Sequence, residues 1–516
     1  MRSTNSVRNI TVNLIAQLVA NLLRFVCETV FIQTLGKAYL GVSGAFGNFL
    51  TLFSLAEMGF GTAIVFSMYK PLAEDDRPKL GALVALYGRV YRIVGCAVAA
   101  IGLVILPFYR VFLKDVPDIP HLTAIYLLYL FNSVMTYFLS YRQSIIVADQ
   151  KSYICTVYQY GFCILQNAVQ IAVLFWKRDF VLYLVTQLLF NFFTNFFLAR
   201  KADRMYPYLK TFRNEKLGEE DRRSITRNIR ALFLHQMGGT VVNGTDQLVI
   251  SGLVGVESAG IYALYYLITS TLRGLTSQIF SSITASVGNL GAEENREKSH
   301  DVFLCVNFAG FWIFSFCFIC LLVLFNPFIT LWTQRSDTVF SMSVVLLIAL
   351  NFYATGMRQA TLTFKNAFGL FWYDRYKAVA EAALNLGLSV FLTLRFGVIG
   401  VFAGTLVSTL AVDLWVEPLV LYRHGFRRSV RPYFLRYAFY GALTAGTAVL
   451  TWRLCAWLPD AGLAAFLGKC AVCALFPNAV YLAVFWRSPE LRYLFGLMRE
   501  PLLRVRNRLA RGRDAE

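Results

Sequence analysis

Residues 41–68, GVSGAFGNFLTLFSLAEMGFGTAIVFSM, form an apolar run with a single charged residue, Glu57. A helix that crosses the hydrocarbon core of a bilayer needs about 20 predominantly apolar residues, and this run is longer. Because lipid offers no water to the backbone, such a segment must be a helix or a strand of a closed barrel. The run lacks the alternation of apolar and polar residues that barrel strands show. It therefore predicts a transmembrane helix that carries a carboxylate.

Apolar runs of this kind recur along all 516 residues of the chain, which is 57% hydrophobic and 15% charged, with a mean hydropathy of +0.54. This composition is typical of a polytopic membrane protein. We predict an all-α polytopic membrane protein with about fourteen transmembrane helices. The predicted spans are 10–33, 41–68, 83–106, 121–144, 153–176, 179–199, 229–253, 258–288, 301–329, 339–363, 374–394, 397–422, 433–456 and 464–486.

The net charge of +19 is distributed unevenly along the chain. Lys and Arg gather in 200–230, 423–436 and 487–513, whereas the short loops between them hold few. This is the positive-inside pattern of a membrane protein, and it places both termini in the cytoplasm. It indicates anionic membrane lipids rather than nucleic acid as the partner of the basic residues. Residues 487–516 are predicted to be a basic amphipathic tail on the cytoplasmic surface.

A repeat at a constant offset of 219 residues divides the chain. Matching positions include Arg8-Asn9-Ile10 with Arg227-Asn228-Ile229, Gly36 with Gly255, and Gly41 with Gly260. The offset covers six predicted helices, an even number, so both copies begin on the cytoplasmic side and are parallel. We expect two pseudo-twofold six-helix lobes, residues 1–226 and 227–432, followed by two further helices in 433–486.

An acidic elbow, PLAEDDRPK at 71–79, recurs as LGAEENREK at 290–298. Because both copies of the repeat carry it, we interpret it as a solvated cytoplasmic turn. Glu57 does not recur, since its counterpart is Thr276, and Arg273 is likewise specific to the second copy. We expect Glu57 and Arg273 to approach a cavity between the lobes from opposite sides. The alternative is that Glu57 is bonded locally at the glycines that follow it.

Polar side chains recur on one face of several predicted spans. The first span carries Asn13, Gln17, Asn21, Arg24 and Glu28, and the seventh carries His235, Gln236, Asn243, Asp246 and Gln247. A charge at the bilayer midplane costs about 2.5–3.5 kcal/mol on insertion scales, so such residues usually face the interior or a water-filled cavity. We expect a hydrated substrate cavity lined by Asn21, Arg24, Glu28, Glu57, Asn243, Asp246, Arg273 and Arg358.

Two structural explanations of these residues stay open: amides bond neighbouring helices, and Arg24 pairs with Glu28 four residues away. In the functional interpretation, Arg24 and Arg273 are candidates for binding a phosphate. Glu28, Glu57 and Asp246 are then candidates for binding a coupling H⁺ or Na⁺.

The sequence offers little for covalent chemistry. Its four histidines lack metal spacing, and it has no phosphate-binding loop and no H-E-x-x-H motif. Two C-x-x-C pairs lie inside apolar spans, where cysteine commonly acts as a small hydrophobe. We predict no metal site, no cofactor apart from a coupling ion, and no enzymatic activity.

Residues 35–76, LGKAYLGVSGAFGNFLTLFSLAEMGFGTAIVFSMYKPLAEDD, together with the plan of twice six helices plus two, resemble the multidrug/oligosaccharidyl-lipid/polysaccharide (MOP) exporter superfamily. Within it the chain is similar to the polysaccharide transporter branch, the Wzx-type flippases. The resemblance implies a V-shaped polar cavity between the lobes. It also implies a bacterial cytoplasmic membrane, an undecaprenyl-diphosphate-linked oligosaccharide as substrate, and polysaccharide-assembly proteins as partners.

In the related lipid II flippases, basic residues of spans one, two and eight are functional. The resemblance carries this role to Arg24 and Arg273, whereas the second span has Glu57 in place of a basic residue. The sequence thus predicts a flippase that translocates a lipid-linked oligosaccharide by alternating access. The alternative is a cation-coupled small-molecule or drug antiporter of the same fold.

Overall fold

The structure is a computed structural model that describes residues 19–20, 22–53, 60–108, 113–114, 119–149, 151–212, 215, 217–219, 223, 244–292, 296–370, 373–374, 376–459 and 462–494. Within these ranges the chain forms helices joined by short segments, with no strand, which confirms the predicted all-α class. The chain divides into two compact units, Met1–Leu264 with Ala378–Val401, and Tyr265–Lys377 with Phe402–Glu516. The predicted lobe boundaries stay a prediction.

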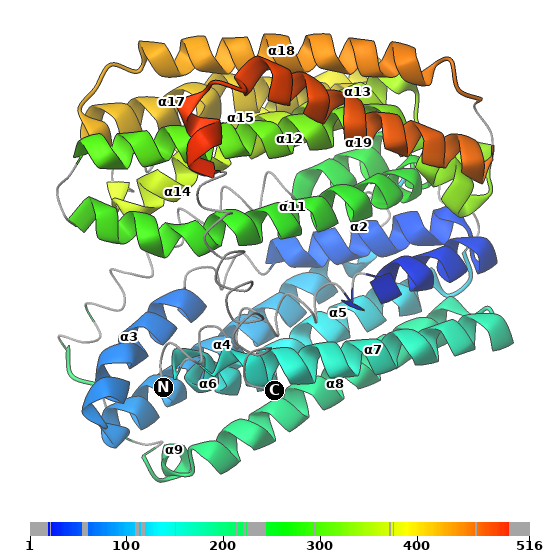
Figure 1. Cartoon of the computed structure of the whole chain (residues 1–516). Helices are drawn as coiled ribbons and strands as arrows, with labels where there is room; N and C mark the ends of the chain where they lie inside the picture. Colours follow the sequence, from blue (N-terminus) through cyan, green and yellow to red (C-terminus); the bar gives the residue numbers. More distant parts are fainter. Residues whose placement is uncertain are drawn as a thin grey trace, which may run out of the picture. The chain divides into compact units, whose positions relative to one another are not determined.

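The first unit begins with a helix over residues 22–34. It continues with α2 (Lys37–Phe53), α3 (Phe60–Glu74), α4 (Arg77–Ile105), α5 (Leu122–Ser140), η3 (Tyr141–Gln143), α6 (Ser144–Ala148), α7 (Ser152–Trp176), α8 (Phe180–Met205) and α9 (Tyr208–Thr211). After a helix over 244–249 come the π-helical η4 (Ile250–Val254), the start of α11 (Val256–Ala292) and most of α15 (Lys377–Phe396). Helices α7 and α8 pack along their length, and α8 also packs on α5 (Figure 1).

The second unit contains the rest of α11. It also contains α12 (Arg296–Thr333), η5 (Ser336–Thr338), α13 (Met342–Met357), α14 (Gln359–Ala367), the end of α16 (Val398–Ser408), η7 (Thr409–Asp413), α17 (Leu414–Val420), η8 (Leu421–Phe426), α18 (Arg431–Cys455) and α19 (Leu463–Phe485). The long helix α12 packs against α13, α18 and α19 and forms the centre of this unit.

Two helices show that the polar side chains lie inside and the apolar ones outside. Helix α15 buries Glu381, Asn385, Ser389 and Thr393, and it exposes Leu384, Leu386, Phe391 and Leu394. Helix α18 buries Tyr440, Thr444, Thr447 and Thr451, and it exposes Leu435, Phe439, Val449 and Leu450. A water-soluble helix would show the opposite pattern. Buried hydroxyls and amides with an apolar exterior are the arrangement that lipid requires.

Seven of the described helices are long and apolar enough to cross a membrane by length and composition alone. They are Arg77–Phe108, Leu122–Ala148, Phe180–Met205, Glu297–Thr333, Lys377–Phe396, Val398–Phe426 and Leu463–Phe485. Together with the polar interiors of α15 and α18, they confirm a polytopic membrane protein.

Several predicted spans are not single regular helices, and three of them matter for the site. Residues 41–68 fall on α2 and α3, with 54–59 between them outside the described residues. The span 339–363 breaks at Arg358, where α13 ends and α14 begins. The span 397–422 consists of α16, η7, α17 and the start of η8. Arg358 at this break and Asp413 at the end of η7 belong to one cluster of buried charges, described below.

The first copy of the acidic elbow is a helix start. Asp75 adopts a positive φ of 52°, and the carboxylate of Asp76 accepts a hydrogen bond of 3.0 Å from the backbone N–H of Lys79. This bond satisfies one of the free N–H groups of the first turn of α4. Arg77 reaches back to Asp75, with 3.1 Å between Nη2 and Oδ2. The elbow copy at 290–298 includes residues 293–295, which lie outside the described residues.

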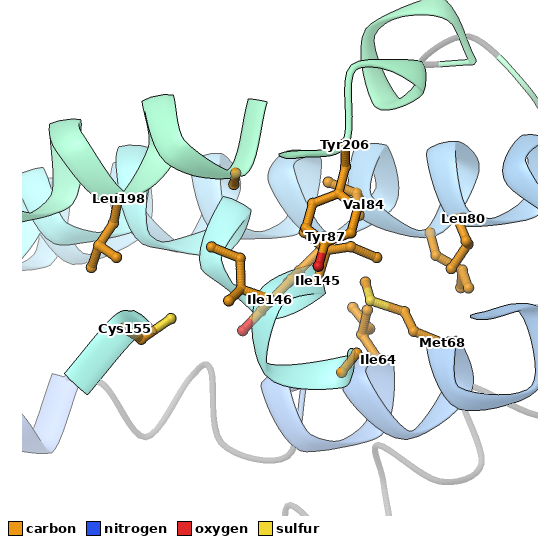
Figure 2. Close-up of a cluster of buried hydrophobic side chains, with 13 residues drawn as sticks. Ile64, Met68, Leu80, Val84, Tyr87, Ile145, Ile146, Cys155, Leu198 and Tyr206 are labelled. Atoms are coloured by element: carbon orange, nitrogen blue, oxygen red, sulfur yellow. The ribbon is translucent and has the colours of Figure 1, made fainter. Parts of the chain in front are cut away.

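A compact apolar cluster lies where α3, α4, α6, α7 and α8 converge (Figure 2). Its members include Ile64, Met68, Leu80, Val84, Tyr87, Ile145, Ile146, Cys155, Leu198 and Tyr206. Short helix α6 is packed into this cluster by Ile145 and Ile146, both fully buried. The cluster thereby joins five helices of the first unit.

Helices α2 and α11 meet backbone to backbone at two glycines. A Cβ on Gly41 would overlap the carbonyl oxygen of Val256, and it would lie 3.0 Å from the amide nitrogen of Gly260. A Cβ on Gly260 would overlap the carbonyl oxygen of Lys37, and it would lie 3.1 Å from the amide nitrogen of Gly41. No residue with a side chain fits at either position.

This contact is reciprocal under the sequence repeat. The offset of 219 residues relates Gly41 to Gly260 and Lys37 to Val256, so each copy offers the same glycine to the same carbonyl of the other. Just before the contact, Gly36 and Gly255 are also related by the repeat, and both have a positive φ, 92° and 148°. The pairing is that of two equivalent segments about a local twofold axis, which supports the predicted duplication.

Substituting either glycine of this contact should destabilise the protein. We expect Gly41→Ala and Gly260→Ala each to cost about 1–3 kcal/mol, because the new methyl group forces the two backbones apart. The measurement is the thermal unfolding midpoint of the purified protein. Gly47→Ala is the matched control on the same helix, since a Cβ there meets nothing within 4 Å. Equal midpoints for Gly41→Ala and Gly47→Ala would contradict the tight contact.

Candidate functional site

Arg24 and Glu28 lie one turn apart on the first helix, as their spacing of four residues predicts. The Nε of Arg24 is 3.9 Å from Oε1 of Glu28, and the side chains are 57% and 22% exposed. An exposed ion pair at this distance contributes at most about 1 kcal/mol. The pair is therefore loose, and both groups stay accessible to a ligand. Asn21, from the same predicted face, lies outside the described residues.

Asp246 is buried, with 9% of its surface exposed, in the helix over residues 244–249. Its two neighbours fix this segment. The hydroxyl of Thr245 donates to Oδ1 of Asn385 on α15 at 3.5 Å, and Nε2 of Gln247 donates to the carbonyl of Ala259 on α11 at 2.9 Å. A carboxylate is thus buried inside the first unit, one residue from Thr245, which contacts the polar face of α15. Asn243 lies outside the described residues.

The described residues contain no group of three or more His, Cys, Asp or Glu side chains placed to hold a metal ion. Any coupling ion at Asp246 would therefore rely on hydroxyl, amide and backbone oxygens beside this carboxylate. Such oxygen ligands suit a proton or a hard monovalent cation better than a transition metal.

Arg273 stands on α11 in the second unit. Its Nε is buried and has no hydrogen-bond partner among the described residues. The hydroxyl of Thr276, one turn further along α11, donates to the carbonyls of Leu272 and Arg273 at 2.9 Å and 3.1 Å. An unpartnered guanidinium N–H in a buried position is costly, and an anionic acceptor would relieve that cost. Glu57, its predicted opposite, lies outside the described residues.

Arg358 lies in a different environment from Arg24 and Arg273, because two carboxylates already engage it. Its Nε and Nη2 donate to the two oxygens of Glu417 at 3.0 Å and 2.8 Å, and its Nη1 contacts Asp413. Lys377 contacts Glu417 as well, and its Nζ lies 3.0 Å from Oδ1 of Asp413. Asp413 and Glu417 are fully buried. The predicted cavity role of Arg358 stays a prediction, and a ligand there would have to displace a carboxylate.

Of the eight predicted cavity residues, the structure places Arg24, Glu28 and Asp246 in the first unit and Arg273 and Arg358 in the second. Sequence reasoning did not single out Lys377, Glu381, Asp413 and Glu417, all of which are largely or fully buried. A signal for two of them was available. Asp413 and Glu417 stand four residues apart inside a predicted apolar span, and this spacing places two charges on one helix face.

The fold is that of a group of known membrane transporters. A structure of the lipid II flippase MurJ in an inward closed conformation aligns with 92% of this chain and 98% of its own, with a TM-score of 0.67 and 13% identity. An inward-facing multidrug resistance MATE family transporter of the MOP superfamily aligns with 81% of this chain and 99% of its own, with a TM-score of 0.58 and 14% identity. A mutant of the Vibrio cholerae MATE transporter VcmN aligns with 82% and 99%, with a TM-score of 0.52 and 13% identity.

At these identities the likeness shows the fold, and each of the three structures is of a transporter rather than an enzyme. No curated protein matches the chain by sequence. A family profile described as "Polysaccharide biosynthesis protein" matches residues 6–287, which is more than half of the chain. The chain therefore belongs to the polysaccharide biosynthesis protein family and has the fold of the membrane transporters of the MOP superfamily, as its sequence resemblance predicts.

Proposed function

We propose that the protein is a flippase that moves an undecaprenyl-diphosphate-linked oligosaccharide from the cytoplasmic to the outer leaflet of a bacterial cytoplasmic membrane. Both termini are then cytoplasmic, and polysaccharide-assembly proteins supply and use the lipid-linked sugar. The family match to polysaccharide biosynthesis proteins supports this substrate class. Translocation breaks no covalent bond. It needs a polar path for the diphosphate and sugars, while the polyprenyl chain stays in lipid.

The state of Arg273 is the observation that carries the proposal. Among the three arginines predicted to line a cavity, Arg358 is neutralised by two carboxylates and Arg24 is loosely paired with Glu28. Arg273 has a buried Nε with no partner among the described residues. A diphosphate offers oxygens to which a guanidinium can bond in a bidentate way. We assign to Arg273 a contact with the diphosphate, and Arg24 stays a candidate for a phosphate contact from the sequence prediction.

Alternating access gives the glycine contact between α2 and α11 a role in transport. In the predicted topology, Gly41 and Gly260 lie near the outer ends of the second and eighth spans. Their backbone contact would close the path on the outer side, and release of the substrate to the outer leaflet would require these two helix ends to separate. Rocking of one repeat against the other about such a contact is the motion that internal symmetry favours.

Arg273→Ala should lower the rate at which a labelled lipid-linked oligosaccharide is flipped in proteoliposomes by about 10- to 100-fold. This range corresponds to the loss of a charge-assisted hydrogen bond worth about 1.5–3 kcal/mol. Arg273→Lys should recover part of the rate, because it keeps the charge but loses the bidentate geometry. Arg24→Ala should have a smaller effect.

The matched control for these variants is Arg92→Ala. Arg92 is exposed on α4, and its Nε donates to the carbonyl of Gly88 at 3.1 Å. Membrane insertion of every variant is checked by its yield in the membrane fraction. A wild-type flipping rate in Arg273→Ala would remove the diphosphate contact from the proposal.

The buried carboxylate of Asp246 favours a second candidate function, a cation-coupled antiporter of small molecules. Asp246 lies in the first unit beside Thr245, which bonds Asn385. Such a site can take up H⁺ or Na⁺ and release it in another conformation. The same site could equally couple an ion gradient to flipping. Glu28 is a further predicted candidate for this role, since its ion pair with Arg24 spans a long 3.9 Å.

Asp246→Asn should abolish the stimulation of flipping by an imposed H⁺ or Na⁺ gradient while leaving downhill equilibration between leaflets. The substitution keeps the size of the side chain but removes the charge that binds the cation. Asp179→Asn is the control, because Asp179 caps α8 by accepting from the Leu182 N–H at 3.1 Å, and asparagine also caps helices. Gradient-driven transport of cationic dyes by the wild-type protein, lost in Asp246→Asn, would instead establish the antiporter.

A further inference from the structure

Four charged residues from three stretches of the second unit form one buried cluster. We call it the buried quartet: Arg358, Lys377, Asp413 and Glu417. The side chains of Arg358 and Lys377 are 12% and 9% exposed, and those of Asp413 and Glu417 are fully buried. Each cation contacts both carboxylates. The quartet holds two positive and two negative charges and is therefore neutral.

Neutrality matters because all four groups are withheld from water. A buried charge that loses its partner is left uncompensated, and this is far more destabilising than the loss of an exposed ion pair. Because the two carboxylates share two cations, removal of any one member leaves a net charge in the cluster. The geometry of the quartet is therefore held only as long as all four charges are present.

The backbone is irregular at each place where the quartet attaches. Arg358 lies at the break between α13 and α14, and Lys377 is the first residue of α15. Asp413 ends the π-helical η7, and Glu417 stands on α17, a helix of seven residues that contains Pro418. A second π-helical segment, η8, follows α17 directly. Helix α17 is thus a short element bounded by π-helical turns, which often mark functional sites in helices.

The first unit has an ion pair at the comparable place, and it is built differently. Arg142 lies in η3, at the break between α5 and α6, and its Nη1 donates to Oδ2 of Asp203 near the end of α8 at 2.8 Å. These side chains are 37% and 18% exposed, and Lys210 also reaches Asp203 at 3.2 Å. Helix α8 carries no π-helical turn beside this pair. The pair of the first unit is therefore partly exposed, whereas the quartet of the second unit is buried.

We propose that the buried quartet is a charge-balanced latch on α17. When its ion pairs are intact they hold α17 and the turns η7 and η8 in the conformation seen here, and when they part, this segment moves as a unit during transport. In the predicted topology the latch lies at the cytoplasmic ends of the tenth, eleventh and twelfth spans. The inference rests on the proposed function only for its transport assay.

Hydrogen–deuterium exchange of the full-length protein in lipid nanodiscs tests the latch without any substrate. Glu417→Gln leaves the cluster with one excess positive charge. We expect amide exchange in peptides covering 409–426 to accelerate about tenfold or more, because local opening becomes easier. Peptides of α12 and α18 should keep wild-type protection. The double variant Glu417→Gln/Lys377→Gln is neutral again, and its exchange in 409–426 should be intermediate.

Asp203→Asn is the matched control, since it removes the carboxylate of the partly exposed pair in the first unit. In Asp203→Asn, amide exchange around residue 203 should change only slightly. The change should be much smaller than that of 409–426 in Glu417→Gln. Unchanged protection of 409–426 in Glu417→Gln would overturn the latch. An equal rise of amide exchange in α12 and α18, with a lower unfolding midpoint, would also overturn it. That result would show that the quartet stabilises the whole unit rather than α17 alone. If Glu417→Gln does not fold, the double variant Glu417→Gln/Lys377→Gln is used instead. Wild-type protection of 409–426 in the double variant would contradict the proposal.

The flipping assay in proteoliposomes separates the latch from the proposed function. A folded Glu417→Gln protein with a mobile 409–426 segment should flip the lipid-linked oligosaccharide more slowly than wild type. A mobile segment with a wild-type rate would overturn the role of the latch in transport. Absence of flipping by the wild-type protein would count against the proposed function but would leave the exchange result intact.

Discussion

The backbone contact between Gly41 of α2 and Gly260 of α11 is the constraint around which the repeat is built. Each glycine faces the carbonyl oxygen of the residue four positions before its partner, so the two copies meet through equivalent atoms. Neither position tolerates a Cβ, which explains why glycine stands at both. The glycines that precede them, Gly36 and Gly255, have a positive φ of their own. Two helices that meet in this way can pack closely without interlocking large side chains. That combination suits helices that a transporter must later separate.

The charges inside the helical bundle fall into two kinds, and their surroundings distinguish them. The quartet around Arg358 pairs its positive charges with its own carboxylates, so its charges serve the conformation of the second unit. Arg273 has an unpartnered Nε among the described residues, and Arg24 has only a distant partner, so these groups are suited to an external anion. Lipid makes every unpaired charge expensive. A charge that the protein leaves unpaired is therefore a better candidate for substrate binding than one that it neutralises.

Much of the fold could be predicted from the sequence, because the thickness of the bilayer sets the length of the apolar runs. The helices α7, α18 and α19 begin and end within two residues of the predicted spans. The elbow at 71–79 was interpreted as a turn, and Asp76 indeed caps α4 there. The break at Arg358 and the π-helical turns around α17 were not predicted. They depend on which distant carboxylates meet Arg358, and periodicity along one helix carries no information about such partners.

The candidate site could be predicted only in part, for the same reason. The pairing of Arg24 with Glu28 follows from their spacing of four residues, and the structure places the two side chains 3.9 Å apart. The quartet required Arg358, Lys377, Asp413 and Glu417 to be brought together from three spans, and sequence reasoning named one of the four. The polar face of α15, which buries Glu381 and Asn385, was likewise not predicted. Its polar residues recur every four positions, but the apolar residues between them make the span look uniformly apolar. The roles of Asn21, Glu57 and Asn243 stay predictions.

Flipping of a lipid-linked oligosaccharide is the central claim, and leaflet-resolved reconstitution tests it most directly. The full-length protein is reconstituted into vesicles with a polyprenyl-diphosphate oligosaccharide that carries a fluorescent sugar label, and a membrane-impermeant quencher is added outside. The account predicts that the labelled lipid of both leaflets becomes quenchable at a rate that rises with protein content. Quenching confined to the outer leaflet, as in protein-free vesicles, would contradict it.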